Sequence, residues 1–236
     1  MTGGCLKDID VIILAGGLGT RIRGILGDTP KVLAPINGKP YLEHLLEWLE
    51  GFGAQRIIMS LGHLSDKVEA YLRDRPQVEC ITETKPLGTG GSIRYGRPAF
   101  RSEPVLIMNG DTWLGTDLEP FVESHIASGR ALSLMCVEVD DVSRYGKLEI
   151  DGSTVRLFLE KDPDDTGPGY VNGGVYLFSQ NALDELCARE AVSLERDYFF
   201  RLAPGSIGAF IPKRATFIDI GTSESLEASA SVLSGK

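Results

Sequence analysis

Short apolar runs alternate with amphipathic stretches through the first half of the chain. Runs of β-type residues predict strands at Val11–Leu14, Arg56–Ser60, Val78–Thr82 and Pro104–Met108. Helices are predicted between them at Pro40–Phe52, Ser65–Arg73 and Gly90–Arg97. The first of these helices carries one apolar face, made of Tyr41, Leu42, Leu45, Leu46, Leu49 and Phe52. Strands that alternate with helices in this way are typical of a parallel sheet with crossover connections.

The second half is richer in strands and has shorter helices. Strands of a mixed sheet are predicted at Ala131–Val139, Gly146–Ile150, Val155–Glu160 and Tyr170–Phe178. The later elements are short helices near Gln180–Cys187 and Glu195–Leu202, strands at Phe210–Ile211 and Thr216–Ile220, and a closing helix at Ser223–Leu233. The loop Asp162–Gly169 is rich in proline, glycine and aspartate, which predicts a mobile flap over a site.

Composition and charge narrow the class of protein. The chain has 236 residues, of which 42% are hydrophobic, enough for one large α/β domain with a full core. A formal net charge of −9 disfavours nucleic acid and anionic membranes as partners, and means that an anionic substrate needs local cations or a metal ion. The four cysteines lie far apart, and no run approaches a signal peptide or the roughly 18 apolar residues of a membrane span. We therefore expect a cytoplasmic protein.

A glycine-rich segment follows the first predicted strand. It comprises Leu14, Ala15, Gly16, Gly17, Leu18, Gly19, Thr20 and Arg21. Such glycines let backbone N–H groups approach anionic oxygens, and Arg21 and Lys31 add two cations, so the segment predicts a cradle for a polyphosphate. The dinucleotide-binding fingerprint is excluded because its third glycine falls on Ile22, and a P-loop is excluded because Ile25 and Leu26 occupy its Lys-Ser/Thr positions. An ordinary tight turn between strand and helix remains the alternative.

Two carboxylates follow predicted strands, where open α/β sheets bind their ligands. Asp111 ends the sequence Asn109-Gly110-Asp111, and Asp219 lies two residues before Gly221. Mg²⁺ is usually held by one or two carboxylates together with substrate phosphates, so this pair suits Mg²⁺. The alternatives are a simple turn at Asp111 and a helix N-cap region at Asp219.

A second glycine-rich loop, Pro86–Gly91, enters a predicted helix. A helix N-terminus favours an anion or a close ligand. Glu83 lies just upstream, and its carboxylate matches the adjacent N1–H and N2–H₂ donors of guanine, although a solvated surface carboxylate is the alternative. The three histidines, His44, His63 and His125, are expected to be structural or at the surface, and no nucleophilic triad is present.

The segments Leu14–Arg21, Pro30-Lys31 and Gly38-Lys39-Pro40 together resemble the signature of the sugar-1-phosphate nucleotidyltransferases. These enzymes join a sugar 1-phosphate to a nucleoside triphosphate and release pyrophosphate, and the resemblance covers essentially the whole chain. It implies a Rossmann-like three-layer α/β/α fold with a mostly parallel central mixed sheet, the GT-A-like nucleotidyltransferase fold. It also implies a single domain over residues 1–236, with a nucleotide-binding half over about 1–112, a sugar-phosphate-binding half over about 113–236 and no C-terminal β-helix domain.

The same resemblance implies roles for individual residues. Aspartates matching Asp111 and Asp219 hold the catalytic Mg²⁺, and the second loop, including Gly88 and Thr89, contacts the nucleobase and ribose. Sugar-phosphate binding is implied for Gly146, Glu160, Lys161, Asn172 and Gly173. Lys161 would pair with the sugar phosphate, which makes the catalytic set Arg21, Lys31, Asp111 and Lys161. Taken alone, each motif that contains a predicted sugar-phosphate residue is also typical of a turn or a solvated strand end.

The segment Ile22–Thr29 resembles the bacterial heptose branch of the family more than its glucose or thymidylyl branch. The resemblance is strongest to the D-glycero-α-D-manno-heptose 1-phosphate guanylyltransferases. It implies GTP and that heptose 1-phosphate as substrates, and GDP-heptose for cell-surface polysaccharide as product; a homodimer is the commonest oligomer. Several alternatives stay open: mannose 1-phosphate or another sugar 1-phosphate, another base, a GT-A-like glycosyltransferase, and a non-catalytic sensor of nucleotide-sugars.

Overall fold

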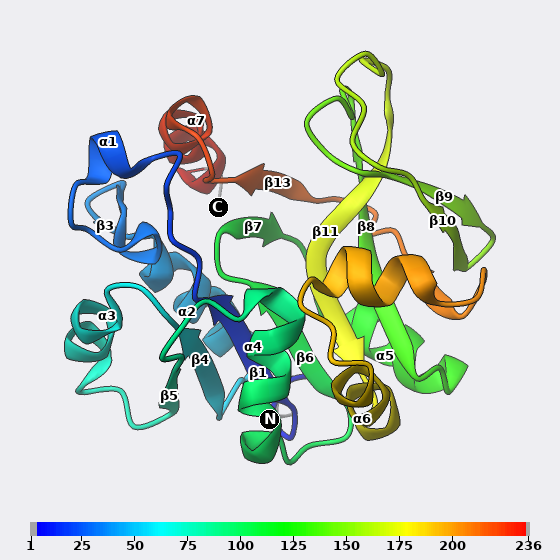
Figure 1. Cartoon of the computed structure of the whole chain (residues 1–236), viewed down its shortest axis with the longest axis horizontal. Coiled ribbons are helices and arrows are strands. Elements are labelled where there is room, and N and C mark those ends of the chain that lie inside the picture. Colours follow the sequence, from blue (N-terminus) through cyan, green and yellow to red (C-terminus); the bar gives the residue numbers. More distant parts are fainter. Residues whose placement is uncertain (1–3, 235–236) are drawn as a thin grey trace.

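Nine strands form one continuous sheet through the molecule (Figure 1). In this computed structural model, which describes residues 4–234, their order is β5-β4-β1-β6-β11-β8-β12-β10-β9. The strands are β1 (Asp10–Ala15), β4 (Ile57–Leu61), β5 (Val78–Thr82), β6 (Val105–Asn109), β8 (Leu132–Val139), β9 (Lys147–Asp151), β10 (Thr154–Phe158), β11 (Gly169–Phe178) and β12 (Ile207–Phe210). The strands predicted from the sequence are confirmed, although β12 begins before the expected Phe210.

The first half of the sheet is parallel, as the alternation of strands and helices predicts. β1 lies between β4 and β6 and runs parallel to both, with Val11 opposite Ile57 and Leu106. β5 extends this parallel set beyond β4. The four strands therefore present their carboxyl ends at one edge of the sheet. The glycine-rich segment follows β1 at this edge, and Gly110 and Asp111 follow Asn109, the last residue of β6.

The second half of the sheet is mixed, as predicted, but antiparallel pairings prevail there, so the expectation of a mostly parallel sheet as a whole is wrong. β11 runs antiparallel to β6 and β8, and β10 runs antiparallel to β9 and β12. The physical reason is local: β9 and β10 are separated only by Gly152 and Ser153, and a link this short can only form a hairpin. The first residues of β9 also pair with the start of β11, so that strands β11, β8, β12, β10 and β9 close on one another.

Helices connect and cover the strands. They are α1 (Arg23–Leu26), α2 (Tyr41–Gly51), α3 (Ser65–Leu72), α4 (Gly88–Gly96), α5 (Glu119–Ser128), α6 (Gln180–Ala188) and α7 (Ser223–Ser234), with short turns η1 (Lys31–Leu33), η2 (Arg97–Ala99), η3 (Leu194–Tyr198) and η4 (Phe199–Arg201). α2 begins directly after Pro40 and buries the apolar face that the sequence predicts. Among residues 4–234, no helix combines the length and the apolar character that crossing a bilayer requires.

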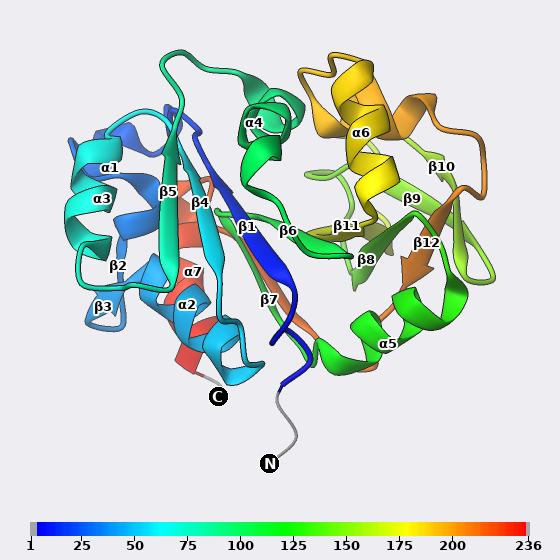
Figure 2. The ribbon, with the colours of Figure 1, turned by 90° about the horizontal axis from the view of Figure 1, so that it is seen from below.

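Helices lie against both faces of the first half of the sheet (Figure 2), and apolar residues alternate between the two cores that they cover. Val11 and Ile13 of β1 pack into the core that includes residues of α2, α3 and α5. Ile12, between them, points to the opposite core, which includes residues of α4 and α6. This alternation explains why the first strands read as continuous apolar runs: both of their faces are buried.

A two-stranded sheet returns the end of the chain to the edge of the first half. β7 (Thr112–Gly115) pairs antiparallel with β13 (Thr216–Asp219). The sequence predicts β13 and α7 but neither β7 nor α5, which lie between its expected elements. α7 is attached to the first half by Asn37, whose Nδ2 donates to the Ala230 carbonyl at 2.8 Å. β2 (Pro35–Ile36) and β3 (Lys39–Pro40) form a further short pair.

Candidate active site

The ends of β1 and β6 touch through a glycine. The Gly110 N–H donates to the Leu14 carbonyl at 2.8 Å. A Cβ on Gly110 would lie 2.7 Å from that same oxygen, so a larger residue would push the two strand ends apart. The glycine-rich segment after β1 and Asp111 after β6 are therefore held side by side.

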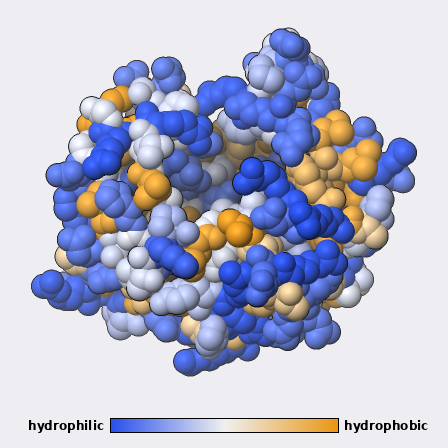
Figure 3. Space-filling view, in the orientation of Figure 1, coloured by the Kyte–Doolittle hydropathy of each residue, from blue (hydrophilic) through white to orange (hydrophobic). Residues whose placement is uncertain are grey.

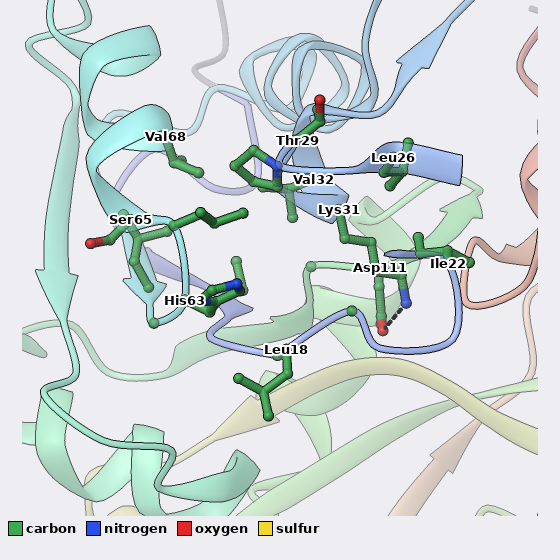
Figure 4. Close-up of a pocket in the computed structure, with 18 of the residues that line it drawn as sticks. Leu18, Ile22, Leu26, Thr29, Lys31, Val32, His63, Ser65, Val68 and Asp111 are labelled. Carbon is green, nitrogen blue, oxygen red and sulfur yellow. Dashed lines mark hydrogen bonds and ion pairs between the residues drawn. The ribbon is translucent and has the colours of Figure 1, made fainter. Parts of the chain in front are cut away.

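Lys31 and Asp111, predicted separately as a phosphate-binding cation and a metal-binding carboxylate, form an ion pair (Figure 4). Lys31 Nζ donates to Asp111 Oδ2 at 2.8 Å. The Lys31 side chain is 15% exposed and that of Asp111 is 44% exposed. The pair thus lies at the rim of a pocket, where either partner can exchange the other for a ligand group.

Asp219 lies beside Asp111 because β13 pairs with β7. Asp219 is opposite Thr112 in the register, and the Ile220 N–H donates to the Asp111 carbonyl at 2.9 Å. Asp219 Oδ1 in turn accepts the Gly221 N–H. Burial, followed by the charges of these two aspartates, raises the pKa of Tyr41 well above its usual value. Two aspartates more than a hundred residues apart in sequence therefore face one region.

These carboxylates fit a Mg²⁺ ion better than a metal that needs a full cage of protein ligands. Over residues 4–234, no group of three or more His, Cys, Asp or Glu side chains is placed to hold a metal ion. Mg²⁺ requires only one or two carboxylates when phosphate and water oxygens complete its shell. The donor set at Asp111 and Asp219 is of that kind.

The two glycine-rich loops line a single pocket. Its lining is Leu14, Gly16, Gly17, Leu18, Glu83, Pro86, Leu87, Gly88, Thr89, Ser92, Asn109 and Asp111. Seven of these residues belong to the predicted nucleotide or metal set. The space-filling view is hollowed near the centre of this face (Figure 3). The fold thus joins two motifs that are about seventy residues apart in the sequence.

Glu83 is buried in the wall of this pocket, so the interpretation of a solvated surface carboxylate is wrong. Glu83 is only 7% exposed. It accepts the Leu87 N–H at 3.1 Å and the Ser92 hydroxyl. Gly16 leaves room for it, because a Cβ there would lie 3.3 Å from Glu83 Oε1. The carboxylate is thereby fixed in one orientation.

Gly88 and Thr89 also have structural partners. Gly88 has φ +74°, and a Cβ at this position would lie 2.5 Å from the Val192 carbonyl. Thr89 Oγ1 accepts the Leu194 N–H at 2.8 Å, and the Gly90 N–H donates to Val192 at 2.8 Å. The second loop therefore packs against the segment that leads into η3, a contact that its sequence does not reveal.

The remaining residues of the first segment lie elsewhere. Ala15 and Gly19 line a neighbouring pocket that also includes Leu18, Asp111, Lys31 and His63 (Figure 4). Thr20 and Arg21 are exposed and, within the described part of the chain, do not belong to the lining of either pocket. The structure thus brings Lys31 to Asp111 but leaves Arg21 outside. His44 and His125 are buried, as expected, with hydrogen-bond partners at Ile36 and Ser133.

A separate pocket, called the second pocket below, gathers four of the five predicted sugar-phosphate residues. It is lined by Tyr145, Gly146, Phe158, Leu159, Glu160, Lys161, Asn172, Glu195, Arg196 and Phe200. Gly173 is the exception: it packs inside the sheet, where a Cβ would lie 2.9 Å from the Met135 carbonyl. Arg196 adds a cation that the sequence analysis missed, because it belongs to no motif. Within the predicted flap, Asp165 forms an ion pair of 2.9 Å with Lys147 of β9.

Known proteins share this sequence pattern over most of its length. The nucleotidyl transferase family model matches residues 10–234. The chain is 34% identical over 221 residues to D-glycero-alpha-D-manno-heptose 1-phosphate guanylyltransferase from Aneurinibacillus thermoaerophilus, covering 90% of this chain and 93% of that protein. It is 33% identical over 196 residues to mannose-1-phosphate guanylyltransferase from Mycobacterium tuberculosis, covering 81% of this chain and 54% of that protein.

Solved structures agree with these matches. The crystal structure of HddC from Yersinia pseudotuberculosis superposes with a TM-score of 0.83 and 38% identity, covering 94% of this chain and 98% of HddC. HddC complexed with GMP-PN gives a TM-score of 0.82. The expected nucleotidyltransferase fold and the expected enzyme class are thereby confirmed. The chain belongs to the nucleotidyl transferase family, as an enzyme of the sugar-1-phosphate guanylyltransferase type.

Proposed function

We propose that this enzyme transfers GMP from GTP to D-glycero-α-D-manno-heptose 1-phosphate, giving GDP-heptose and pyrophosphate. The observation that carries the transfer is the Lys31–Asp111 ion pair, whose aspartate lines the pocket formed by both glycine-rich loops. The similarity to a heptose 1-phosphate guanylyltransferase over 90% of the chain supports this substrate pair. The four cysteines are free thiols, which agrees with our proposal of a cytoplasmic location.

The reaction needs positioning and charge more than it needs proton transfer. An oxygen of the sugar phosphate attacks the α-phosphorus of GTP in line, and the bond from that phosphorus to the bridging oxygen of the β-phosphate breaks. The electron pair leaves with pyrophosphate. No general base is required because the sugar phosphate is already ionised near pH 7.

Cations of the chain would hold the reacting phosphates. Lys31 would leave Asp111 for the β- and γ-phosphates, where its charge offsets that of the departing pyrophosphate. Arg21, now exposed, would reach the same phosphates from the solvent side. Lys161, in the second pocket, would orient the attacking phosphate.

Asp111 and Asp219 would hold Mg²⁺. When bound, the ion supplies positive charge to the phosphate oxygens and brings them together. Release of Lys31 to the phosphates would free Asp111 for this role.

Specificity would come from the walls of the two pockets. Glu83 still has acceptor capacity after its bonds to Leu87 and Ser92, which suits the two adjacent donors of guanine. Glu160 and Asn172 would meet the sugar hydroxyls, and Gly146 would let its backbone approach the sugar.

Mannose 1-phosphate is the second candidate acceptor. The mannose-1-phosphate guanylyltransferase of Mycobacterium tuberculosis is 33% identical to this chain, which is nearly as similar as the heptose relative. One extra hydroxymethylene group changes binding by only about 1–3 kcal/mol, so the enzyme would use both sugars at different rates.

The test is release of pyrophosphate with Mg²⁺ across ATP, GTP, CTP, UTP and dTTP, each with a panel of sugar 1-phosphates. We expect the highest kcat/KM for GTP with manno-heptose 1-phosphate. A higher value with another pair would keep the transfer and overturn the substrates. Binding of GDP-sugar without any pyrophosphate release would favour a glycosyltransferase or a sensor.

A further inference from the structure

An irregular step in β11 lies between the two pockets. The register of β11 with β8 shifts between Asn172 and Tyr176. At this step the Gly174 N–H donates to Asn172 Oδ1 at 2.8 Å, and Gly174 has φ +73°. Bulges of this kind are common next to active sites, where they redirect a side chain.

Two asparagines meet at the hydroxyl of Tyr176. Asn172 Nδ2 donates to Tyr176 Oη at 2.8 Å. Asn109, at the end of the neighbouring strand β6, lies near enough to this hydroxyl to lower the Tyr176 pKa, against the larger opposing effect of burial. Gly174 makes the approach of Asn109 feasible, because a Cβ there would lie 2.9 Å from Asn109 Nδ2. The Tyr176 side chain itself is fully buried.

The Asn109 amide is incompletely paired in its buried position. Asn109 Oδ1 is buried and has no hydrogen-bond partner among residues 4–234. A buried carbonyl without a partner is costly. The Asn109 amide therefore depends on its neighbours at the end of β11 for its orientation.

The two asparagines belong to different pockets. Asn109 lines the pocket of the two glycine-rich loops, next to Asp111. Asn172 lines the second pocket, with Glu160 and Lys161. Tyr176 belongs to the lining of neither pocket and reaches each one only through an asparagine.

We propose that Tyr176 is a positioning residue that fixes Asn109 toward the nucleotide and Asn172 toward the sugar 1-phosphate, through a single buried hydroxyl. This inference rests on the proposed function, because that function assigns the two pockets to the two substrates. It goes further by linking the two subsites through one side chain that touches neither substrate.

Tyr176→Phe tests the inference with the ring retained. The ring packs against Phe199 at 5.3 Å between centroids, and phenylalanine preserves that contact. The matched control is Tyr198→Phe, since Tyr198 is equally buried and its hydroxyl donates to the Ala182 carbonyl at 3.1 Å, outside both pockets. Both variants lose one buried hydroxyl, so we expect similar decreases in melting temperature.

The kinetic readout separates positioning from stability. In Tyr176→Phe, KM for the sugar 1-phosphate should rise about tenfold and KM for the nucleotide severalfold, as expected for a lost hydrogen bond. Tyr198→Phe should change neither KM. Adding Tyr176→Phe to Asn172→Ala should raise KM for the sugar 1-phosphate no further, because the tyrosine acts through that amide. Equal KM values in Tyr176→Phe and Tyr198→Phe would overturn the inference.

The same experiment keeps this inference distinct from the proposed substrates. The wild-type enzyme is first tested on the full panel, and the variants are then compared on the pair that it uses fastest. Side-chain amide signals of Asn109 and Asn172 in ¹H–¹⁵N spectra need no turnover; Tyr176→Phe should shift both, and Tyr198→Phe neither. Unshifted signals in Tyr176→Phe would overturn the inference even for an inactive enzyme.

Discussion

The two glycine-rich loops have similar compositions but different environments. In the first, a Cβ on Gly17 would meet nothing within 4 Å, and Leu18 beside it is 50% exposed. In the second, a Cβ would lie 2.5 Å from the Val192 carbonyl at Gly88 and 2.7 Å from the Ala191 carbonyl at Gly90. The first loop leaves its backbone open to a ligand, whereas the second uses glycine to pack one backbone against another.

The difference teaches that glycine content alone does not identify a phosphate-binding loop. What distinguishes the loops is the partner of the backbone: solvent at Gly17, and the segment before η3 at Gly88 and Gly90. The pocket that the two loops line therefore has one open wall and one packed wall, and substitutions in the two walls should have different effects.

The largest expected effect is at the rim of the open wall. Lys31→Ala and Asp111→Asn should each lower kcat by about 10²–10³, because each removes a charge from the reacting phosphates or their metal ion. Rates of pyrophosphate release and thermal melting curves check this. Arg97→Ala is the control, since Arg97 forms an ion pair with Asp184 at 2.6 Å outside the pocket. Wild-type turnover in folded Asp111→Asn would contradict the assignment.

The next largest effect is expected at Glu83, whose carboxylate lies in the wall of the pocket. Glu83→Gln should reduce kcat/KM for GTP by about 10–100-fold, because an amide replaces a charged acceptor for guanine. The value of kcat/KM for ATP should change far less. Parallel losses with both nucleotides would mean that Glu83 only supports Leu87 and Ser92.

Stability should separate the two loops directly. Gly90→Ala should lower the free energy of unfolding by about 1–3 kcal/mol, because its methyl group collides with the Ala191 carbonyl. Gly17→Ala should stay within about 0.5 kcal/mol of wild type, since its surroundings are open. Urea denaturation measures both, and equal losses would remove the contrast between the loops.

The smallest expected effect is a pH dependence of stability caused by His125, which lies outside both loops. Burial lowers the pKa of His125 to about 4, below its ordinary value of 6.5. Between these values the unfolded chain binds the proton more readily, so stability present above pH 6.5 is lost as the pH falls toward 4. The melting temperature of His125→Gln should depend less on pH in this window than that of wild type. If wild type and His125→Gln show the same dependence of melting temperature on pH, other groups cause the loss of stability in acid.

The first half of the fold could be predicted because its strands are buried on both faces. Runs such as Val11–Leu14 and Pro104–Met108 have no polar interruption, and the resulting alternation with helices fixes a parallel arrangement. The direction of β11 and the closure of the last strands could not be predicted, since they depend on pairings between distant segments. β7 was missed because its four residues are too few to show a pattern.

The site divides in a similar way. Asp111 could be found because it directly follows an apolar strand, and Lys31 because it belongs to a recognisable motif. Arg196 and Tyr176 could not, since one lies in an irregular turn and the other reads as an ordinary core residue. Their relation to the pockets exists only after β11 and η3 are in place.

The closure of the last strands leaves the large sheet with unequal borders. At one border, Lys147 and Leu148 of β9 pair with the start of β11, so little unpaired backbone remains there. At the other border β5 pairs only with β4 in the nine-stranded order. Free N–H and C=O groups recruit further strands, so intermolecular strand addition to this sheet would occur chiefly along β5. Its outward Glu79, held by Arg56 at 2.6 Å, places charge on that border and guards it against unwanted association.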